Sequence, residues 1–145
     1  MAFSPTNALK LRNSLLSLFI AGFLSVLVFH QGFLTLWYLW GMTSNPPFPM
    51  RATAPFGVPQ IWSYAFWGGV WGLVFGFVAS RWPAGAKYWI GAILFGALAP
   101  TLFGRLVLPL LRGESMNFEL PTLWRGLLIN GVWGLGAAVV LRWRP

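Results

Sequence analysis

Four long apolar runs are the feature that most limits how this chain can fold. They cover about residues 14–40, 61–80, 88–111 and 123–141. A hydrocarbon core about 30 Å thick needs roughly 20 apolar residues of helix to cross it, and lipid offers no partner to an unpaired backbone group. The runs therefore predict an all-α fold, a compact bundle of four transmembrane helices within a single membrane domain of residues 1–145.

The composition fits a chain immersed in lipid. Hydrophobic residues make up 57% of the sequence and charged residues only 8%, whereas a soluble domain carries about 25% charged residues. The net charge of +8 comes from basic residues that stand singly between apolar runs. Nucleic-acid binding needs such residues clustered on one face, so we expect lipid headgroups as partners and no nucleic acid. The absence of cysteine removes disulfides and thiolate metal sites.

The first run and the basic residues indicate how the chain enters the membrane. Residues 14–40 are too long for the apolar core of a signal peptide and lack a small-residue cleavage site, so we expect a retained helix. Basic residues favour the cytoplasmic side of short loops. Six lie on the side of the termini and four on the other, which predicts that both termini are cytoplasmic. The six are Lys10, Arg12, Arg81, Lys87, Arg142 and Arg144.

Small residues recur at every fourth position along three of the runs. The second run carries the clearest row, at Gly68, Gly72, Gly76 and Ser80. Glycine weakens a helix in water by about 1 kcal/mol relative to alanine, but in a bilayer such rows let two helix backbones approach closely. We therefore expect packing faces here and in the later rows, which include Gly96, Gly104, Gly126 and Gly134.

The pentapeptide GVWGL occurs twice, at residues 69–73 and 131–135. Both copies lie in helices that run in the same direction, so a parallel repeat of two helical hairpins is possible. The flanking residues match poorly, and chance similarity is the other explanation.

The connections differ in length and chemistry. Residues 41–60 hold five prolines, which predict an extended, polyproline-like chain. This loop is either a stiff connector or a docking loop for another membrane subunit. The turn at residues 81–87 is so short that the helices on either side should be antiparallel neighbours. Pro100 should kink the third helix, and Arg105 should extend to the interface.

Polar residues lie at a common depth inside the four runs, about 10 to 15 Å from one membrane surface at 1.5 Å per residue. They are His30, Gln31, Trp71, Thr101 and Asn130. One interpretation is hydrogen bonding between helices, in which the indole N–H of Trp71 or Trp133 bonds to His30 or Asn130. The other is a pocket near Pro100 for a lipid-like or quinone-like molecule, with His30 as the titratable group.

Several chemistries find no support in the sequence. One histidine and two loop glutamates cannot form a metal site of three or four ligands. The chain has no aspartate and no acidic residue within a run, so a catalytic triad and a carboxylate proton relay are both missing. We therefore predict no catalytic residues, no cofactor and no enzymatic activity.

Three segments carry a resemblance to a known group of proteins. These are FHQG at residues 29–32, PFGVPQIWSYAFWGGVWG at 55–72 and NGVWGLG at 130–136. With them the chain resembles a group of uncharacterised bacterial inner-membrane proteins with four spans. The resemblance implies a bacterial inner-membrane location and assigns no activity. We expect an accessory or scaffolding subunit that associates with another membrane subunit or with itself; the alternative is a binder or transporter of a small apolar molecule.

Overall fold

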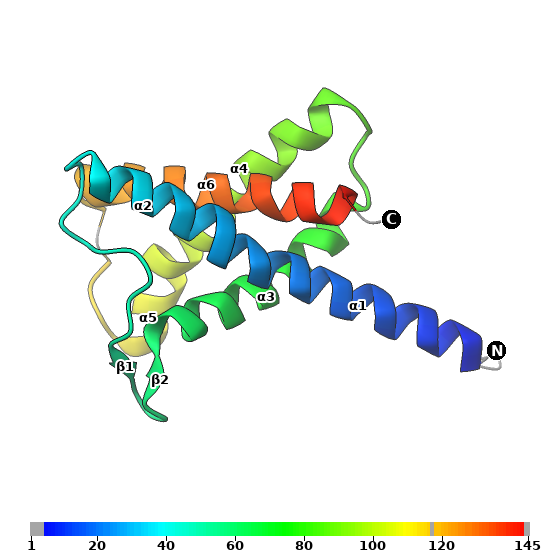
Figure 1. Ribbon diagram of the computed structural model, residues 1–145, viewed down its shortest axis with the longest axis horizontal. Coiled ribbons are helices and arrows are strands. Elements are labelled where there is room, and N and C mark those ends of the chain that lie inside the picture. The colour runs from blue at the N-terminus through cyan, green and yellow to red at the C-terminus, as the bar shows by residue number, and fades with distance from the viewer. Residues whose placement is uncertain (1–4, 117, 144–145) are drawn as a thin grey trace.

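The computed structural model describes residues 5–116 and 118–143, with side chains from residue 14 onward. The chain is almost entirely helical (Figure 1), and the all-α prediction is confirmed. Along the chain lie α1 (Pro5–Ser25), the π-helical segment η1 (Val26–His30), α2 (Gln31–Leu39), β1 (Ala52–Thr53), β2 (Val58–Pro59), α3 (Gln60–Ala79), α4 (Ala86–Leu102), the π-helical segment η2 (Phe103–Val107), α5 (Leu108–Arg112) and α6 (Leu120–Arg142).

Four helical segments are long and apolar enough to cross a membrane, which makes the chain a multi-pass membrane protein. They are Ser14–Leu39, Gln60–Ala79, Ala86–Arg112 and Leu120–Arg142. The fourth helix begins at Leu120, three residues earlier than the sequence predicted. Pro121 stands in its first turn, where a missing N–H leaves no hydrogen bond unmade, so proline there starts the helix and does not delay it.

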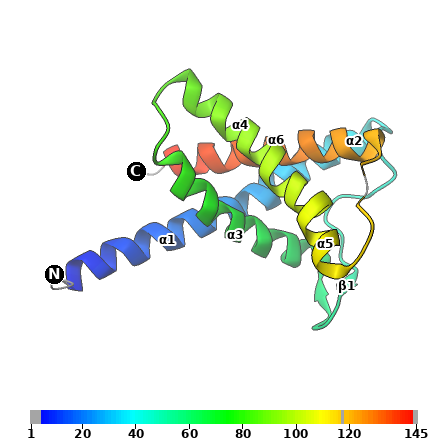
Figure 2. The same cartoon turned by 180° about the vertical axis from the view of Figure 1, so that it is seen from behind.

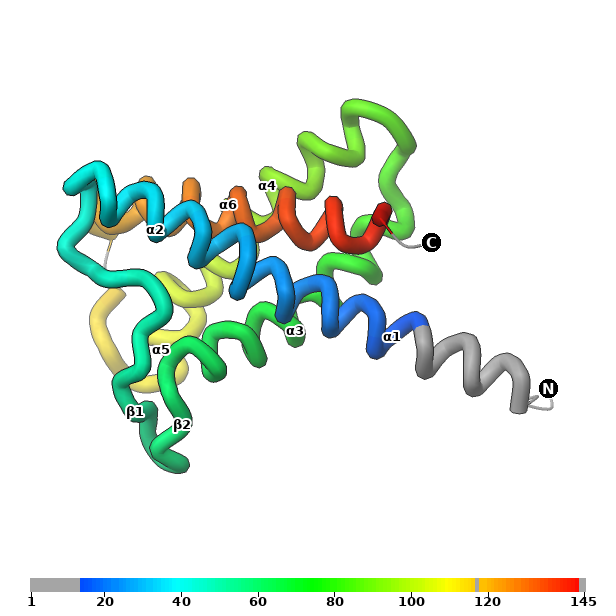
Figure 3. Tube along the Cα trace, in the orientation of Figure 1, coloured from blue at the N-terminus to red at the C-terminus, as the bar shows by residue number. Residues whose placement is uncertain are grey.

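The helices cross one another at wide angles and do not run parallel, as the two opposite views show (Figures 1 and 2). One end of the bundle, here called the loop face, carries the connections at residues 40–59 and 113–119. The other end, the terminal face, carries the start of α1, the end of α6 and the turn between α3 and α4. The tube in Figure 3 shows that α1 and α2 form one continuous rod between these two faces.

Two pairs of helices touch through their backbones. At the crossing of α1 and α3, a methyl group added to Gly72 would lie 2.9 Å from the Cα of Gly22 and 3.0 Å from its nitrogen. At the crossing of α4 and α6, a methyl group on Gly134 would lie 2.9 Å from the Cα of Gly96 and 3.1 Å from its nitrogen. Real Cβ contacts are almost never this short, so each crossing has room for hydrogen atoms only.

The two crossings share one contact pattern. A methyl group on Gly72 would overlap the carbonyl oxygen of Leu18, which lies four residues before Gly22. A methyl group on Gly134 would overlap the carbonyl oxygen of Ala92, which lies four residues before Gly96. The GVWGL repeats place Gly72 and Gly134 at the same position of the pentapeptide. The pair of α1 with α3 is here called the first helical hairpin, and the pair of α4 with α6 the second. In each, a π-helical segment (η1 or η2) follows the first helix of the pair, between the crossing and the loop face. The two hairpins therefore share a backbone geometry as well as a pentapeptide, and duplication of a helical hairpin stays a prediction beside chance similarity.

The glycine rows do not all lie at such contacts. Gly68 faces Val26 and the carbonyl of Gly22, and Gly76 faces the side chain of Leu18. A methyl group on Gly126 would lie 3.3 Å from Cγ2 of Thr101, a tight contact with a side chain and not with backbone. At Gly104 no atom lies within 4 Å of the added methyl position.

Helices α3 and α4 are joined by the short turn but meet through large aromatic side chains. The ring centroids of Phe75 and Phe95 are 5.5 Å apart, and those of Trp71 and Phe103 are 5.6 Å apart. Rings of this size hold two helix axes further apart than glycines do. The more extensive contacts are therefore those of α1 with α3 and of α4 with α6. The predicted neighbours α3 and α4 are in contact and run in opposite directions from their turn (Figure 1).

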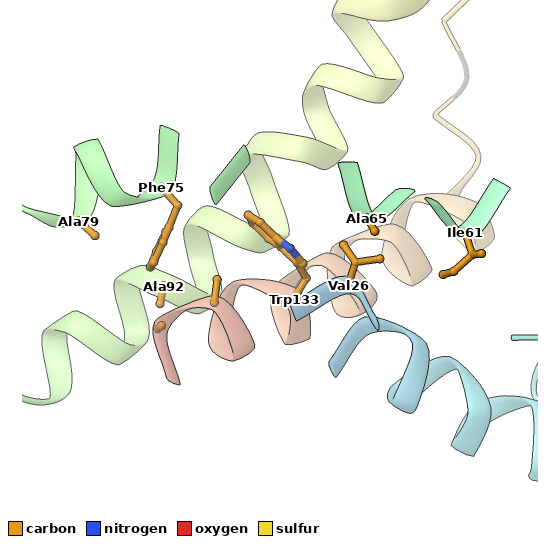
Figure 4. Packing of buried hydrophobic residues seen from close by; sticks show 9 residues of the cluster. Val26, Ile61, Ala65, Phe75, Ala79, Ala92 and Trp133 are labelled. Carbon is orange, nitrogen blue, oxygen red and sulfur yellow. The ribbon is translucent and has the colours of Figure 1, made fainter. Parts of the chain in front are cut away.

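Trp133 lies at the centre of the buried cluster. Figure 4 shows its ring extending from α6 toward α3, between Phe75 and Ala65 in that view. Its indole Nε1 donates a hydrogen bond to the carbonyl of Gly22 at 3.0 Å. The prediction that His30 or Asn130 would accept from this indole is wrong, because the missing side chain at Gly22 leaves that backbone carbonyl accessible to the ring.

Residues 41–59 are more structured than the predicted extended chain. β1 and β2 form an antiparallel hairpin in which Ala52 pairs with Pro59 and Thr53 with Val58. Its turn needs a positive φ, which Gly57 supplies at 68°. The hairpin extends beyond the end of α3 at the loop face (Figure 1).

Candidate functional site

The five polar residues predicted to share one depth lie in three separate contacts. His30 contacts Gln31, which bonds to the loop of residues 41–59. Thr101 and Asn130 bond to each other between α4 and α6, and Trp71 belongs to the aromatic contact of α3 with α4 and η2. Two shallow surface grooves formed by described residues are lined by other side chains.

Gln31 fastens the loop to the helices. Its side chain is fully buried, and its Oε1 accepts a hydrogen bond of 2.6 Å from the backbone N–H of Phe48. Phe48 has a φ of 51°, a conformation that a bulky residue rarely adopts. A buried side-chain acceptor therefore holds the loop in a fixed and unusual backbone conformation.

The same contact defines the state of His30. A backbone N–H can only donate, so the Gln31 atom that meets Phe48 is the oxygen. The amide nitrogen of Gln31 then faces Nδ1 of His30 at 3.2 Å. Because an amide NH₂ is a donor only, Nδ1 must accept, and this geometry assigns the neutral imidazole with its proton on Nε2. The His30 ring lies near the ring of Tyr64, with centroids 6.5 Å apart.

Gln31 also begins the regular helix that follows η1. Its backbone carbonyl accepts a hydrogen bond of 2.7 Å from Oγ1 of Thr35, one turn later. A π-helical segment shifts the side chains that follow it around the helix axis, and such segments often occur at functional sites. η1 ends at His30, so this shift determines which side of the rod Gln31 occupies.

Thr101 and Asn130 form a polar contact inside the second hairpin. The amide nitrogen of Asn130 donates to Oγ1 of Thr101 at 2.9 Å, and Thr101 is 4% exposed. The pair lies on the loop-face side of the crossing of Gly96 with Gly134. This bond between two helices is of the kind that the first interpretation of the polar layer expected.

Ser25 is a buried polar residue that the sequence interpretation did not include. It is fully buried, and its hydroxyl donates a hydrogen bond of 2.6 Å to the carbonyl of Trp133. Together with the indole bond to Gly22, this ties α1 to α6 at two points. The small residues Ala21, Gly22 and Ser25 follow one another within the first run, and this was the available signal for a close contact there.

Two arginines at the loop-face side of the second hairpin were also not recognised as a pair. The Nη2 of Arg105 donates to the carbonyl of Thr122, in the first turn of α6, at 3.2 Å, and its predicted extension to the interface stays a prediction. Arg125 lies on the same helix, one turn further, and its Nε is buried without a hydrogen-bond partner. The sequence alone gives their depths but not the direction in which α4 presents Arg105.

Within residues 5–116 and 118–143, no group of three histidine, cysteine or acidic residues is placed to hold a metal ion. Comparison with protein-family models, with curated proteins and with solved structures finds no match for this chain. The resemblance to four-span bacterial membrane proteins therefore stays a prediction.

Proposed function

We propose that this chain is an accessory or scaffolding subunit, without enzymatic activity of its own, of a bacterial inner membrane. In each of its two helical hairpins the helices would be held together at a glycine crossing. Residues 41–59 would contact another membrane subunit. The excess of basic residues at the terminal face supports an orientation with both termini in the cytoplasm and the loop face outside.

The observation that carries this proposal is a loop that is both fixed and apolar. Phe56, at the turn of the β-hairpin, is 87% exposed, and Met50 beside the hairpin is 66% exposed. Large apolar side chains held in water or at the headgroup level favour contact with a partner surface.

Hydrogen bonds on both sides of the β1–β2 hairpin keep Met50 and Phe56 in place. The N–H of Gln60 donates to the carbonyl of Arg51 at 2.9 Å, and the N–H of Ile61 donates to the carbonyl of Pro49 at 2.9 Å. The buried side chain of Gln31 holds Phe48 on the other side. A surface that is ordered before binding loses little conformational entropy when a partner arrives.

Photo-crosslinking in intact membranes tests the proposal. A photoreactive phenylalanine analogue at Phe56 should give a discrete adduct with one protein. The matched control is the same analogue at Phe77, which is also an exposed phenylalanine but lies within the α3 span and should give lipid adducts. Equal adduct patterns at the two positions would contradict a partner at the hairpin.

The identity of the partner can be separated into two cases. Because the chain has no cysteine of its own, a disulfide-linked dimer with twice the mass of the chain in a single Phe56→Cys variant must be joined through residue 56 of two copies. Such a dimer would indicate that the β1–β2 hairpin contacts a second copy of the chain. A photo-adduct with a different protein, with no such dimer, would indicate that this hairpin contacts another subunit.

A further inference from the structure

Arg105 and Arg125 lie at matching depths in the second hairpin. Each stands nine residues toward the loop face from the crossing glycine of its own helix, Gly96 or Gly134. At 1.5 Å per residue this is about 13 Å along each helix. Arg105 is seven residues from the end of α5, and Arg125 is five residues from the start of α6. Both guanidinium groups therefore originate near the boundary between the hydrocarbon and the headgroups.

The structure brings the two side chains to one turn of α6. The guanidinium of Arg105 reaches across from η2 and donates to the carbonyl of Thr122. Thr122 lies three residues before Arg125, and residues at this spacing share a face of a helix. An arginine that only extended toward water would have no need of this lateral contact.

Arg125 has an unmet donor. Its Nε is buried and has no hydrogen-bond partner among the described residues. A guanidinium only donates, and Nε alone among the Arg125 nitrogens is buried without a partner, so a ligand from outside would meet the two Nη groups at the end of the side chain. The four membrane spans contain no acidic residue; the nearest carboxylates in the sequence are those of Glu114 and Glu119, in the connection between α5 and α6, and Glu119 directly precedes the first turn of α6.

The local helix geometry is also irregular at this point. Arg105 is the central residue of η2, the π-helical segment between α4 and α5. A π-helical turn widens the helix and redirects the side chains within it, and such turns often accompany binding sites. Trp124 lies next to Arg125 in the sequence, with the guanidinium carbon 6.0 Å from its ring centroid.

We propose that Arg105 and Arg125 form a binding site for a phosphate oxyanion at the loop-face end of the hairpin of α4 and α6. The planar fork of an arginine matches two oxygens of a phosphate, and the Nη groups of both side chains would donate to them. The depth of the pair matches the phosphate of a phospholipid in the adjacent leaflet. Free phosphate from the solvent offers the same chemistry, so the test separates the two sources. This proposal is independent of whether residues 41–59 contact another membrane subunit.

Native mass spectrometry of the purified full-length chain tests the lipid source. The probe is phosphatidylglycerol, titrated into detergent-solubilised protein, and the key variant is Arg125→Lys. Lysine keeps the positive charge and removes the planar fork, so a general attraction of cations for lipid would leave binding unchanged. We expect the apparent Kd to rise about tenfold, which corresponds to the loss of one charge-assisted contact. Arg112→Gln, at the end of α5 but outside the pair, should bind as the unaltered chain does.

A second arm uses inorganic phosphate with lipid-depleted protein and records the thermal unfolding temperature. A rise that Arg125→Lys abolishes supports the site and assigns it to free phosphate as well. Binding of phosphatidylglycerol that depends on Arg125, with no effect of inorganic phosphate, supports the site and assigns it to the lipid headgroup. Equal lipid binding by the unaltered chain and Arg125→Lys, with no effect of phosphate, overturns the proposal.

A folding defect would not leave the question open. If Arg125→Lys does not elute as the unaltered chain does in size-exclusion chromatography, Arg105→Lys replaces it in both arms. An ammonium group at residue 105 can still reach the Thr122 carbonyl but cannot form the planar fork. The same loss of lipid or phosphate binding is expected, and unchanged binding would again overturn the proposal.

Discussion

Replacing Gly96 by alanine should weaken the bundle, because the added methyl group meets the backbone of α6. The methyl carbon would lie 2.7 Å from the Cα of Gly134 and 2.8 Å from its nitrogen, and it would overlap the carbonyl of Asn130. An ordinary contact is 3.4–4 Å. Backbone atoms cannot rotate away as a side chain can, so the two helices must separate by about 1 Å at their crossing.

The size of the effect follows from a comparison with Gly104, in the same membrane span. Gly96→Ala replaces a glycine of α4, and Gly104→Ala replaces a glycine of the π-helical segment η2; each gains backbone rigidity worth up to about 1 kcal/mol. Only Gly96 has neighbours, since nothing lies within 4 Å of the methyl position at Gly104. The difference between the two variants therefore isolates overpacking, which costs about 1–3 kcal/mol.

Reversible unfolding in mixed micelles with rising dodecyl sulfate gives this difference, with circular dichroism as the readout. We expect Gly104→Ala to be as stable as the unaltered chain or slightly more stable. Gly96→Ala should unfold at a lower dodecyl sulfate fraction. If the two variants unfold together, or if Gly96→Ala is the more stable one, the backbone contact does not hold α4 against α6.

Three further changes test individual hydrogen bonds. In a double-mutant cycle, Thr101→Val and Asn130→Leu should show a coupling of about 0.6 kcal/mol in the same unfolding assay, and a coupling near zero would contradict the bond. Trp133→Phe removes the donor to Gly22 and should cost about 1 kcal/mol beyond the change in ring size, whereas a cost equal to that of a Trp→Phe change at an exposed site would contradict it. Gln31→Leu should speed amide hydrogen exchange across residues 41–51, as measured by mass spectrometry, while exchange in the span of α6 stays unchanged.

The four spans could be predicted because the length of an apolar run depends on the bilayer and not on tertiary contacts. Their ends were less certain, as Leu120 shows: proline in a first turn and proline in a loop look alike in a sequence. The π-helical segments were not predicted. Pro100 gave a reason to expect an irregularity in the third span, but the irregular hydrogen bonding occurs at Phe103–Val107.

The glycine rows were informative about one helix at a time. Spacing by four identifies a face but does not identify its partner, and it cannot separate Gly96, which meets a backbone, from Gly104, which meets nothing. Gly22 was missed because it belongs to no row, although it forms the crossing with Gly72.

Depth in the membrane could be estimated for the polar residues, but rotation about the helix axis could not. His30 and Trp71 were predicted at one level, yet His30 contacts Gln31 and the ring of Tyr64, while Trp71 faces Phe95 and Phe103. A π-helical segment immediately before Gln31 makes any such extrapolation unreliable, since it changes the rotation of every later side chain.

The similarity of the two hairpins also indicates where they differ. Their crossings repeat the same glycine contacts, because this geometry depends on the backbone alone and tolerates no side chain. Toward the loop face the hairpins diverge. The first bonds the buried side chain of Gln31 to the loop at Phe48, and the second places Arg105 and Arg125 on two helices near their loop-face ends. If both helical hairpins arose from one ancestral hairpin, the glycine crossings are the feature that both retained. We then expect any specific activity to depend on the residues between the crossings and the loop face.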